Sequence, residues 1–235
     1  DIIGNTSSVK IPVIGKKSNT IFKKQKDTTA YKIIADNFQK FKKENITIAF
    51  PKNTFYKDIY LDFKVDSGVA KVHTPSIPLN KSYTLTFNVS KYTTQEKEQL
   101  YIANTEYAKY PRYVNTRKKD TTFYTTTKTL GKYTLKTDTI KPKAKILYIY
   151  NNQWITSAKT LKVKISDVDS GIKNWRATID GTWVLMQYNH KKGVLTYNFS
   201  DNTLVGSKHI FKIALSDNVG NTIERSITFF KKQTK

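Results

Sequence analysis

An alternation of apolar and polar residues with a period of two runs through most of this 235-residue chain and limits what it can fold into. Residues 46–50, 83–89 and 161–165 are clear examples, rich in the Val, Ile, Thr, Tyr and Phe that suit strands with one buried face. Helix evidence is confined to residues 93–100, where Thr93 offers an N-cap ahead of an acidic first turn. We therefore predict an all-β fold.

Turn signals separate the strand-like segments at the spacing of β-sandwich domains. Asp180-Gly181, set between apolar runs, predicts a two-residue hairpin. A polar stretch with Pro142 begins at Asp138 and marks a domain boundary. We predict tandem β-sandwich domains, one at residues 16–137 and a C-terminal, immunoglobulin-like one at residues 138–235.

A short repeat bears on the remaining residues, 1–15. Asp1-Ile2-Ile3-Gly4-Asn5-Thr6 aligns with residues 217–222, and both fit Asp-x-(Ile/Val)-Gly-Asn-Thr. The second copy leads into the expected last strand of the C-terminal domain. By symmetry, residues 1–15 are expected to be the final strand or hairpin of a truncated upstream immunoglobulin-like domain. Chance similarity of a turn motif is the alternative.

The chain is strongly basic, with 41 Lys and Arg against 18 Asp and Glu and a net charge of +23. Only four of the basic residues are Arg, whereas nucleic-acid readers rely on Arg for bidentate contacts. An AT-rich genome and a solvated surface explain the Lys excess; a cationic face for anionic lipid, glycan or acidic protein is the functional alternative. We expect no nucleic-acid partner, and no apolar run approaches the ~20 residues of a membrane span.

Residues that could carry chemistry are few. The chain has no Cys, which excludes disulfides and thiolate metal sites. His73, His190 and His209 do not stand at ligand spacing, so we expect surface or sheet-edge positions for them. Nucleophile elbows, phosphate loops and dinucleotide fingerprints are missing from the sequence. No catalytic residue, cofactor site or zinc site is predicted within these residues.

One group of carboxylates is a weak candidate for calcium. Asp167 and Asp169 precede a Ser-Gly turn, and Asp217 follows from the later turn. A hard cation takes carboxylate ligands of this kind, although the full calcium-loop pattern is missing. Asx-turns made by the same side chains are the preferred interpretation.

The aromatic residues are the second candidate. Trp154, Trp183 and Tyr188 form a candidate interaction surface, such as a platform for stacking on a glycan. In immunoglobulin-like folds a central Trp usually belongs to the core. We favour the core position for the tryptophans.

Ordered motifs over nearly the whole chain resemble the C-terminal, non-catalytic region of large lysostaphin-type (LytM-like) zinc metallopeptidases of the Gram-negative cell envelope. The segments that carry the resemblance are 50–56, 130–135, 152–155, 161–172, 175–186, 195–201 and 216–221. In that family an upstream domain binds zinc through His-x(3)-Asp and His-x-His motifs and cuts peptidoglycan. Neither motif occurs here, so the resemblance assigns no catalytic residue to this chain.

The resemblance implies a periplasmic or outer-membrane-associated, exported protein. Our first hypothesis is a scaffold and docking region that mediates protein–protein interaction with envelope proteins, such as an outer-membrane protein complex. The alternative is a substrate-positioning region of an active zinc peptidoglycan endopeptidase whose catalytic domain lies upstream, with peptidoglycan as partner. A weaker third hypothesis is a polyanion binder, whose affinity would fall steeply with salt.

Overall fold

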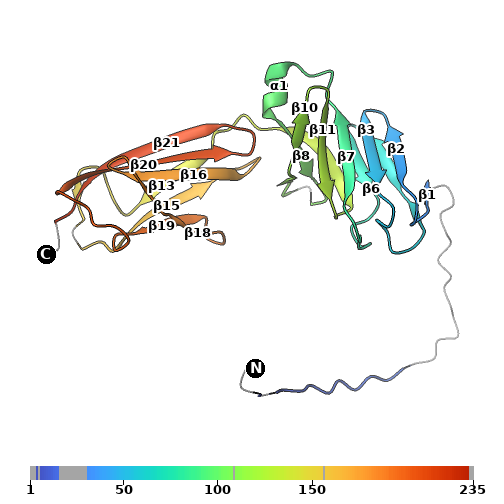
Figure 1. The fold of residues 1–235 in the computed structure, drawn as a ribbon, viewed down its shortest axis with the longest axis horizontal. Helices are drawn as coiled ribbons and strands as arrows, with labels where there is room; N and C mark the ends of the chain where they lie inside the picture. The colour runs from blue at the N-terminus through green and yellow to red at the C-terminus, as the bar shows by residue number, and fades with distance from the viewer. Residues whose placement is uncertain (1–3, 5, 16–30, 108, 156, 233–235) are drawn as a thin grey trace.

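Two β-sandwiches follow one another along the chain, joined by a linker at Asp138 (Figure 1). The predicted all-β, tandem-sandwich fold is confirmed. No helix in the described part of the chain is long and apolar enough to cross a membrane. This computed structural model describes residues 4, 6–15, 31–107, 109–155 and 157–232.

The first sandwich packs two five-stranded sheets face to face. One sheet has the order β10 (Arg117–Lys119), β11 (Thr122–Thr127), β7 (Tyr83–Asn88), β3 (Ile46–Phe50) and β2 (Gln39–Lys43). The other has the order β5 (Phe63–Asp66), β6 (Val69–Val72), β12 (Gly131–Thr137), β8 (Leu100–Asn104) and β9 (Arg112–Tyr113). Strands β1 (Tyr31–Ile33) and β4 (Ile59–Leu61) form a separate antiparallel pair.

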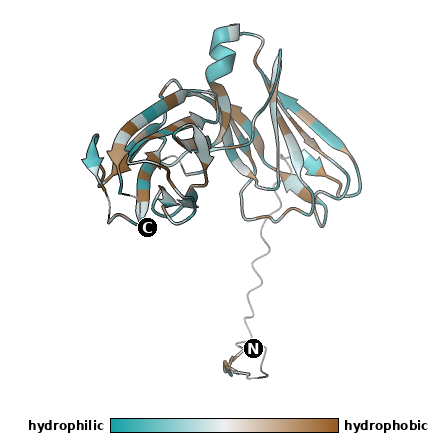
Figure 2. Ribbon diagram, turned by 60° about the vertical axis from the view of Figure 1, so that its left-hand side comes forward, coloured by the Kyte–Doolittle hydropathy of each residue, from teal (hydrophilic) through white to brown (hydrophobic). Residues whose placement is uncertain are grey.

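The period-two pattern produces this core directly. In β3 every second side chain (Ile46, Ile48 and Phe50) is buried, and its neighbours are half-buried. Figure 2 shows the same alternation of hydrophobic and hydrophilic residues along the strands. Each sandwich has its own cluster of buried side chains. The two domains therefore have separate hydrophobic cores.

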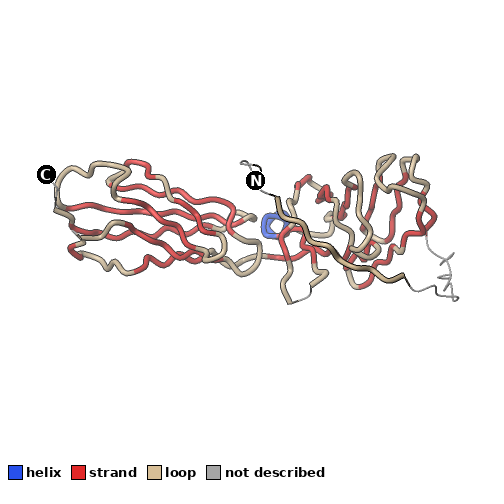
Figure 3. The backbone as a smooth tube through the Cα atoms, turned by 90° about the horizontal axis from the view of Figure 1, so that it is seen from below, coloured by secondary structure: helices blue, strands red, loops and turns tan. Residues whose placement is uncertain are grey.

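The short helix α1 (Thr94–Gln99) confirms the only helix prediction. The Thr93 hydroxyl accepts from the Glu96 backbone N–H at 3.3 Å, and the Glu96 carboxylate accepts from the Thr93 N–H at 2.7 Å. This capping box satisfies two donors that a helix N-terminus leaves unpaired. Figure 3 shows the helix at the end of the first sandwich that faces the second.

The second sandwich has the strand arrangement of an immunoglobulin domain. One sheet has the order β13 (Lys143–Leu147), β15 (Thr160–Ser166), β19 (Val194–Asn198) and β18 (Gln187–Asn189). The other has the order β14 (Gln153–Trp154), β21 (Thr222–Phe230), β20 (Lys208–Asp217), β16 (Ile172–Ile179) and β17 (Thr182–Val184). The first strand is thus split between the sheets, and its second half, β14, runs parallel to the last strand.

The Asp180-Gly181 hairpin is present between β16 and β17, with Ile179 opposite Thr182. Both turn residues have positive φ, 51° and 80°, as a type I′ turn requires. The Asp180 carboxylate also accepts from the Ile210 N–H at 2.7 Å and pairs with Nδ1 of His209 at 2.7 Å. His209 is fully buried, so its predicted surface or edge position is wrong.

This turn carries a testable prediction. Replacing Asp180 by Ala should lower the free energy of unfolding of the second sandwich by about 1–3 kcal/mol, because the buried His209 ring and the Ile210 N–H both lose an acceptor. Urea unfolding measures the change. Asp180→Asn keeps one acceptor and a residue that tolerates positive φ, and should cost less. Equal unfolding midpoints for Asp180→Ala and the unchanged protein would contradict this role.

Residues 6–15 form no strand and pair with no other described residue in a sheet. Val9, Ile11 and Val13 are at least 77% exposed, an apolar row of the kind that a strand buries in a sandwich. Residues 1–3 and 5 of the repeated turn motif lie outside the described residues. That residues 1–15 complete an upstream domain stays a prediction.

Candidate functional site

The predicted calcium residues lie at the junction between the two sandwiches, but the structure groups them differently. Asp167 follows β15, Asp217 ends β20, and Asp138 lies in the linker after β12. One carboxylate oxygen from each of these three residues lies within 4.8 Å of the other two. We call Asp138, Asp167 and Asp217 the junction cluster. Asp169, which was predicted with Asp167 and Asp217, is not part of this group, and its carboxylate lies 3.7 Å from the Lys136 ammonium.

Asp217 organises the turn between β20 and β21. It is fully buried, and its Oδ1 accepts from the backbone N–H groups of Val219, Gly220 and Asn221 at 2.7–3.0 Å. Its Oδ2 accepts from the side-chain amide (Nδ2) of Asn221 at 2.7 Å. The Asx-turn interpretation is therefore confirmed for this residue, whose carboxylate satisfies four donors.

Asp167 makes the matching turn between β15 and β16. Its Oδ1 accepts from the N–H groups of Asp169 and Gly171, at 3.1 and 2.7 Å. Its Oδ2 is buried and has no hydrogen-bond partner among the described residues. Burial raises the pKa of this carboxyl, and the charges of Asp138 and Asp217 raise it further, against the two N–H bonds that lower it. One buried carboxylate oxygen of the junction cluster thus has no hydrogen bond within the described residues to offset the cost of its burial.

Asp138 ties the linker to both turns. Its Oδ2 accepts from the Ser170 N–H at 2.9 Å, and its backbone carbonyl accepts from the Asn221 side chain at 3.2 Å. Its other oxygen accepts from the Ile140 N–H. In the sequence Asp138 marks the domain boundary, but its distance along the chain from Asp167 and Asp217 hides its place in the carboxylate group. An Asp next to a domain boundary, with Asx-turns expected in the adjoining domain, was the available signal.

The first sandwich contributes Tyr101 and Lys136, which face each other across β8 and β12. Their neighbours Ile102 and Leu135 pack into the first core, so this pair projects from the opposite, outer face of the sheet. Tyr101 is 1% exposed, and its hydroxyl has no partner among the described residues. Burial raises its pKa, and the negative charges of Asp169, Asp138 and Asp167 raise it further.

The predicted aromatic surface is not one surface. Trp154 and Trp183 lie on β14 and β17, the two opposite edges of one sheet, and Tyr188 lies on an edge strand of the other sheet. Trp154 is 55% exposed and stacks on Phe230, whereas Trp183 is 52% exposed. The expected core position is therefore wrong for both tryptophans, and three strands separate them within the sheet. No shared platform forms from this set.

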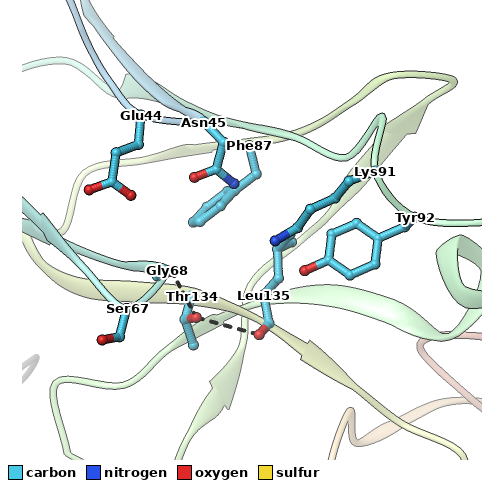
Figure 4. A pocket seen from close by; sticks show the side chains of 9 residues that line it. All are labelled: Glu44, Asn45, Ser67, Gly68, Phe87, Lys91, Tyr92, Thr134 and Leu135. Atoms are coloured by element: carbon cyan, nitrogen blue, oxygen red, sulfur yellow. Dashed lines mark hydrogen bonds between the residues drawn. The ribbon is translucent and has the colours of Figure 1, made fainter.

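A polar pocket of about 270 Å³ opens at one end of the first sandwich (Figure 4). It lies where the β2–β3 and β5–β6 turns approach the ends of β7 and β12, and Figure 4 shows Lys91 reaching into it. The Thr134 hydroxyl is engaged with the Gly68 carbonyl at 3.0 Å. A single ammonium, a single carboxylate and a few neutral polar side chains do not specify a reaction. The lining residues are Glu44, Asn45, Ser67, Gly68, Phe87, Lys91, Tyr92, Thr134 and Leu135.

A larger groove of about 500 Å³ runs along one side of the second sandwich, between β13 and β21. Ala144 and Ile223 provide its apolar surface. The charged residues of its lining are all cations, and we call this feature the cationic groove. It is lined by Lys143, Ala144, Lys145, Lys164, Ser166, Ile223 and Arg225.

Comparison with known proteins finds a family model that is similar to the first sandwich. Residues 30–138 match the model of the Zu5-like domain, a match that ends on the junction residue Asp138. A comparison with curated proteins gave no match. Among solved structures, an endo-beta-1,4-mannanase from Thermotoga petrophila is similar over 41% of this chain and 21% of that chain, at 10% identity and a TM-score of 0.33. A likeness this low carries no argument, and the resemblance to envelope metallopeptidases stays a prediction.

Proposed function

We propose that this chain is a non-catalytic scaffold and docking region of an exported envelope protein, and that it holds an acidic partner protein in the cationic groove. The observation that carries the proposal is the groove itself. Its four charged side chains all have one sign, and Lys143, Lys145 and Arg225 are exposed. Like charges gathered around an apolar floor favour an occupant of opposite charge with apolar side chains.

The groove also offers unpaired backbone. Strand β13 is the edge of its sheet. Strand β21 is bonded to β14 and the residues before it only at Thr228, Phe229 and Phe230, so residues 222–227 form a second sheet edge. Edge strands can bind an extended segment by β-strand addition, in which main-chain bonds give affinity and side-chain pockets give specificity. Lysines on edge strands also prevent self-association, which leaves the groove to a partner that neutralises them.

The junction supports a scaffold role because it fixes the linker. Asp138 is fully buried and bonded to Ser170 and Asn221 of the second sandwich, while Lys136 of the first lies against Asp169. A linker held by such bonds keeps the two domains in a fixed arrangement. In a periplasmic or outer-membrane setting, as the resemblance implies, the chain would place its partner at a fixed distance from whatever domain precedes it.

Charge reversal in the groove tests the proposal. Lys143→Glu/Lys145→Glu should weaken binding of an extended peptide with alternating Glu and Val residues by about tenfold, because attraction at two rim positions becomes repulsion. Fluorescence anisotropy with the labelled peptide measures the affinity, which should also fall as salt is raised. Crosslinking in envelope extracts should show the same loss for the natural partner.

Lys40→Glu/Lys42→Glu is the matched control, since it makes the same charge change at exposed positions of the edge strand β2 in the first sandwich. It should leave peptide affinity within about twofold. Equal weakening by both double variants would mean that only net charge matters, and would support polyanion binding instead. Retention of soluble muropeptides by the groove, with no binding of the acidic peptide, would favour substrate positioning for an endopeptidase.

A further inference from the structure

We propose that Asp138, Asp167 and Asp217 bind a calcium ion that locks the junction between the two sandwiches. The inference does not depend on the cationic groove, whose lining shares no residue with the junction cluster. It begins from the spacing of the three carboxylates, whose closest oxygens all lie within 4.8 Å of one another. Oxygens on opposite sides of a calcium ion at about 2.3–2.6 Å lie about 4.6–5.2 Å apart, so one ion reaches all three without rearrangement.

The number of carboxylates favours calcium over magnesium. Magnesium holds its ligands at about 2.0–2.1 Å in a near-ideal octahedron, keeps several waters and usually takes only one or two carboxylates. Three carboxylates held by two turns and a linker suit the larger, more adaptable calcium ion. The ligands are hard oxygens, and the cluster contains neither His nor Cys, so transition metals that prefer nitrogen or sulfur are disfavoured.

The hydrogen bonds inside the junction cluster do not reach every carboxylate oxygen. The N–H groups of the two Asx-turns are used by Oδ1 of Asp167 and Oδ1 of Asp217. Oδ2 of Asp167 is buried without a partner. A buried, unpaired carboxylate oxygen is costly, and carboxylates in such positions are normally paired or coordinate a metal.

A second and independent observation comes from the other domain. Tyr101 lies opposite Lys136, whose ammonium is 3.7 Å from Asp169 in the turn that follows Asp167. Its buried hydroxyl has no hydrogen-bond partner among the described residues. The hydroxyl of Ser170, in the turn between Asp167 and Gly171, is also buried without one. Two buried hydroxyls and one buried carboxylate oxygen of the junction residues thus have no hydrogen-bond partner among the described residues. A bound cation with its water ligands would satisfy all three.

The location gives the ion a mechanical role. Asp138 belongs to the linker, and Asp167 and Asp217 belong to two turns of the second sandwich that are 50 residues apart in sequence. Tyr101 extends the contact to the first sandwich. An ion bound at this point stabilises only the arrangement in which the linker is docked. Calcium should therefore tighten the junction and raise the stability of the second sandwich.

Direct titration of the 235-residue chain with calcium chloride tests the proposal. After removal of bound metal with a chelator, calorimetry should show one site with a dissociation constant of about 10⁻⁵–10⁻³ M, from the weakest sensors to extracellular modules. At calcium ten times above this constant, the unfolding equilibrium constant of the second sandwich should fall about tenfold. Magnesium at the same concentration should produce a smaller shift.

Substitutions locate the site. Asp167→Asn keeps an oxygen for the two N–H groups but removes the unpaired charge, and should weaken calcium binding at least tenfold. Tyr101→Phe removes only the hydroxyl and should weaken binding by a smaller factor without disturbing either turn. It remains informative if Asp167→Asn fails to fold. Asp169→Asn is the matched control two residues away, and it should keep the dissociation constant within about threefold because its carboxylate faces Lys136.

Three results would overturn the proposal. The first is the absence of any heat of binding, with identical melting curves in calcium and in chelator, at calcium concentrations up to about 5 mM, above the dissociation constants of the weakest extracellular sites. The cluster would then be a set of hydrogen-bonded turns. The second is unchanged calcium affinity in both Asp167→Asn and Tyr101→Phe, which would place any calcium elsewhere. The third is loss of binding in Asp169→Asn alone, which would restore the residue set predicted from sequence.

Discussion

Replacing Asp217 by Ala is expected to destabilise the C-terminal sandwich by about 3–5 kcal/mol, a large part of the stability of a domain of this size. Three backbone N–H groups and the Asn221 amide would lose their common acceptor inside the protein. Unfolding in urea, followed in the presence of a chelator, isolates this hydrogen-bond contribution from any bound cation. The first sandwich should unfold as before.

Two comparisons sharpen this expectation. Asp217→Asn retains an oxygen for the three N–H groups but sets an amide against the Asn221 amide, so its cost should be smaller, about 1–2 kcal/mol. Asp201→Ala, at an exposed position of the same domain, should change stability by less than about 0.5 kcal/mol. If Asp217→Ala were no more harmful than Asp201→Ala, the turn would not depend on the carboxylate.

The second large effect is expected in the other core. Phe50 on β3 is 1% exposed, and its ring centroid lies 5.1 Å from that of Phe55 and 5.0 Å from that of Tyr83. Phe50→Ala should cost the first sandwich about 3–5 kcal/mol through lost burial and the cavity left behind. Calorimetry should show a lower melting temperature for the first sandwich and an unchanged melting temperature for the second.

Phe38→Ala is the matched control for this substitution. The Phe38 side chain is 64% exposed, so deleting it should change stability by less than about 0.5 kcal/mol. A similar loss for the two variants would show that the buried aromatic group contributes little. A fall in the melting temperature of both sandwiches in Phe50→Ala would show that they unfold as one cooperative unit rather than as two domains with separate cores.

Local signals in the sequence predicted the fold because they agree with one another. Alternation in β3 identifies its buried face, Asp180-Gly181 sets the register of β16 and β17, and Thr93 with Glu96 begins the helix. Each of these signals acts over a few residues, where backbone geometry and hydrogen bonding decide the outcome. That locality is why they could be read from a single sequence.

The candidate site depended on contacts between distant segments, and there the sequence was less informative. Asp138 and Asp217 meet only after the sandwich closes, so spacing along the chain suggested Asp169 in place of Asp138. Trp154 and Trp183 were expected in the core because aromatic residues usually fill it, but both lie on edge strands. His209 is buried because its nitrogens meet Asp180 and the Gly206 carbonyl, acceptors that spacing does not reveal.

The docking of Asp138 means that the two domains share a residue. The similarity to the Zu5-like domain ends at Asp138, yet its carboxylate bonds to the Ser170 N–H and its carbonyl to the Asn221 side chain, both in the following domain. A C-terminal fragment produced by cleavage after Asp138 would leave those two donors without acceptors, whereas cleavage a few residues earlier would not. Proteolytic dissection of this protein should therefore yield a stable C-terminal piece only when it carries Asp138 at or near its new amino end.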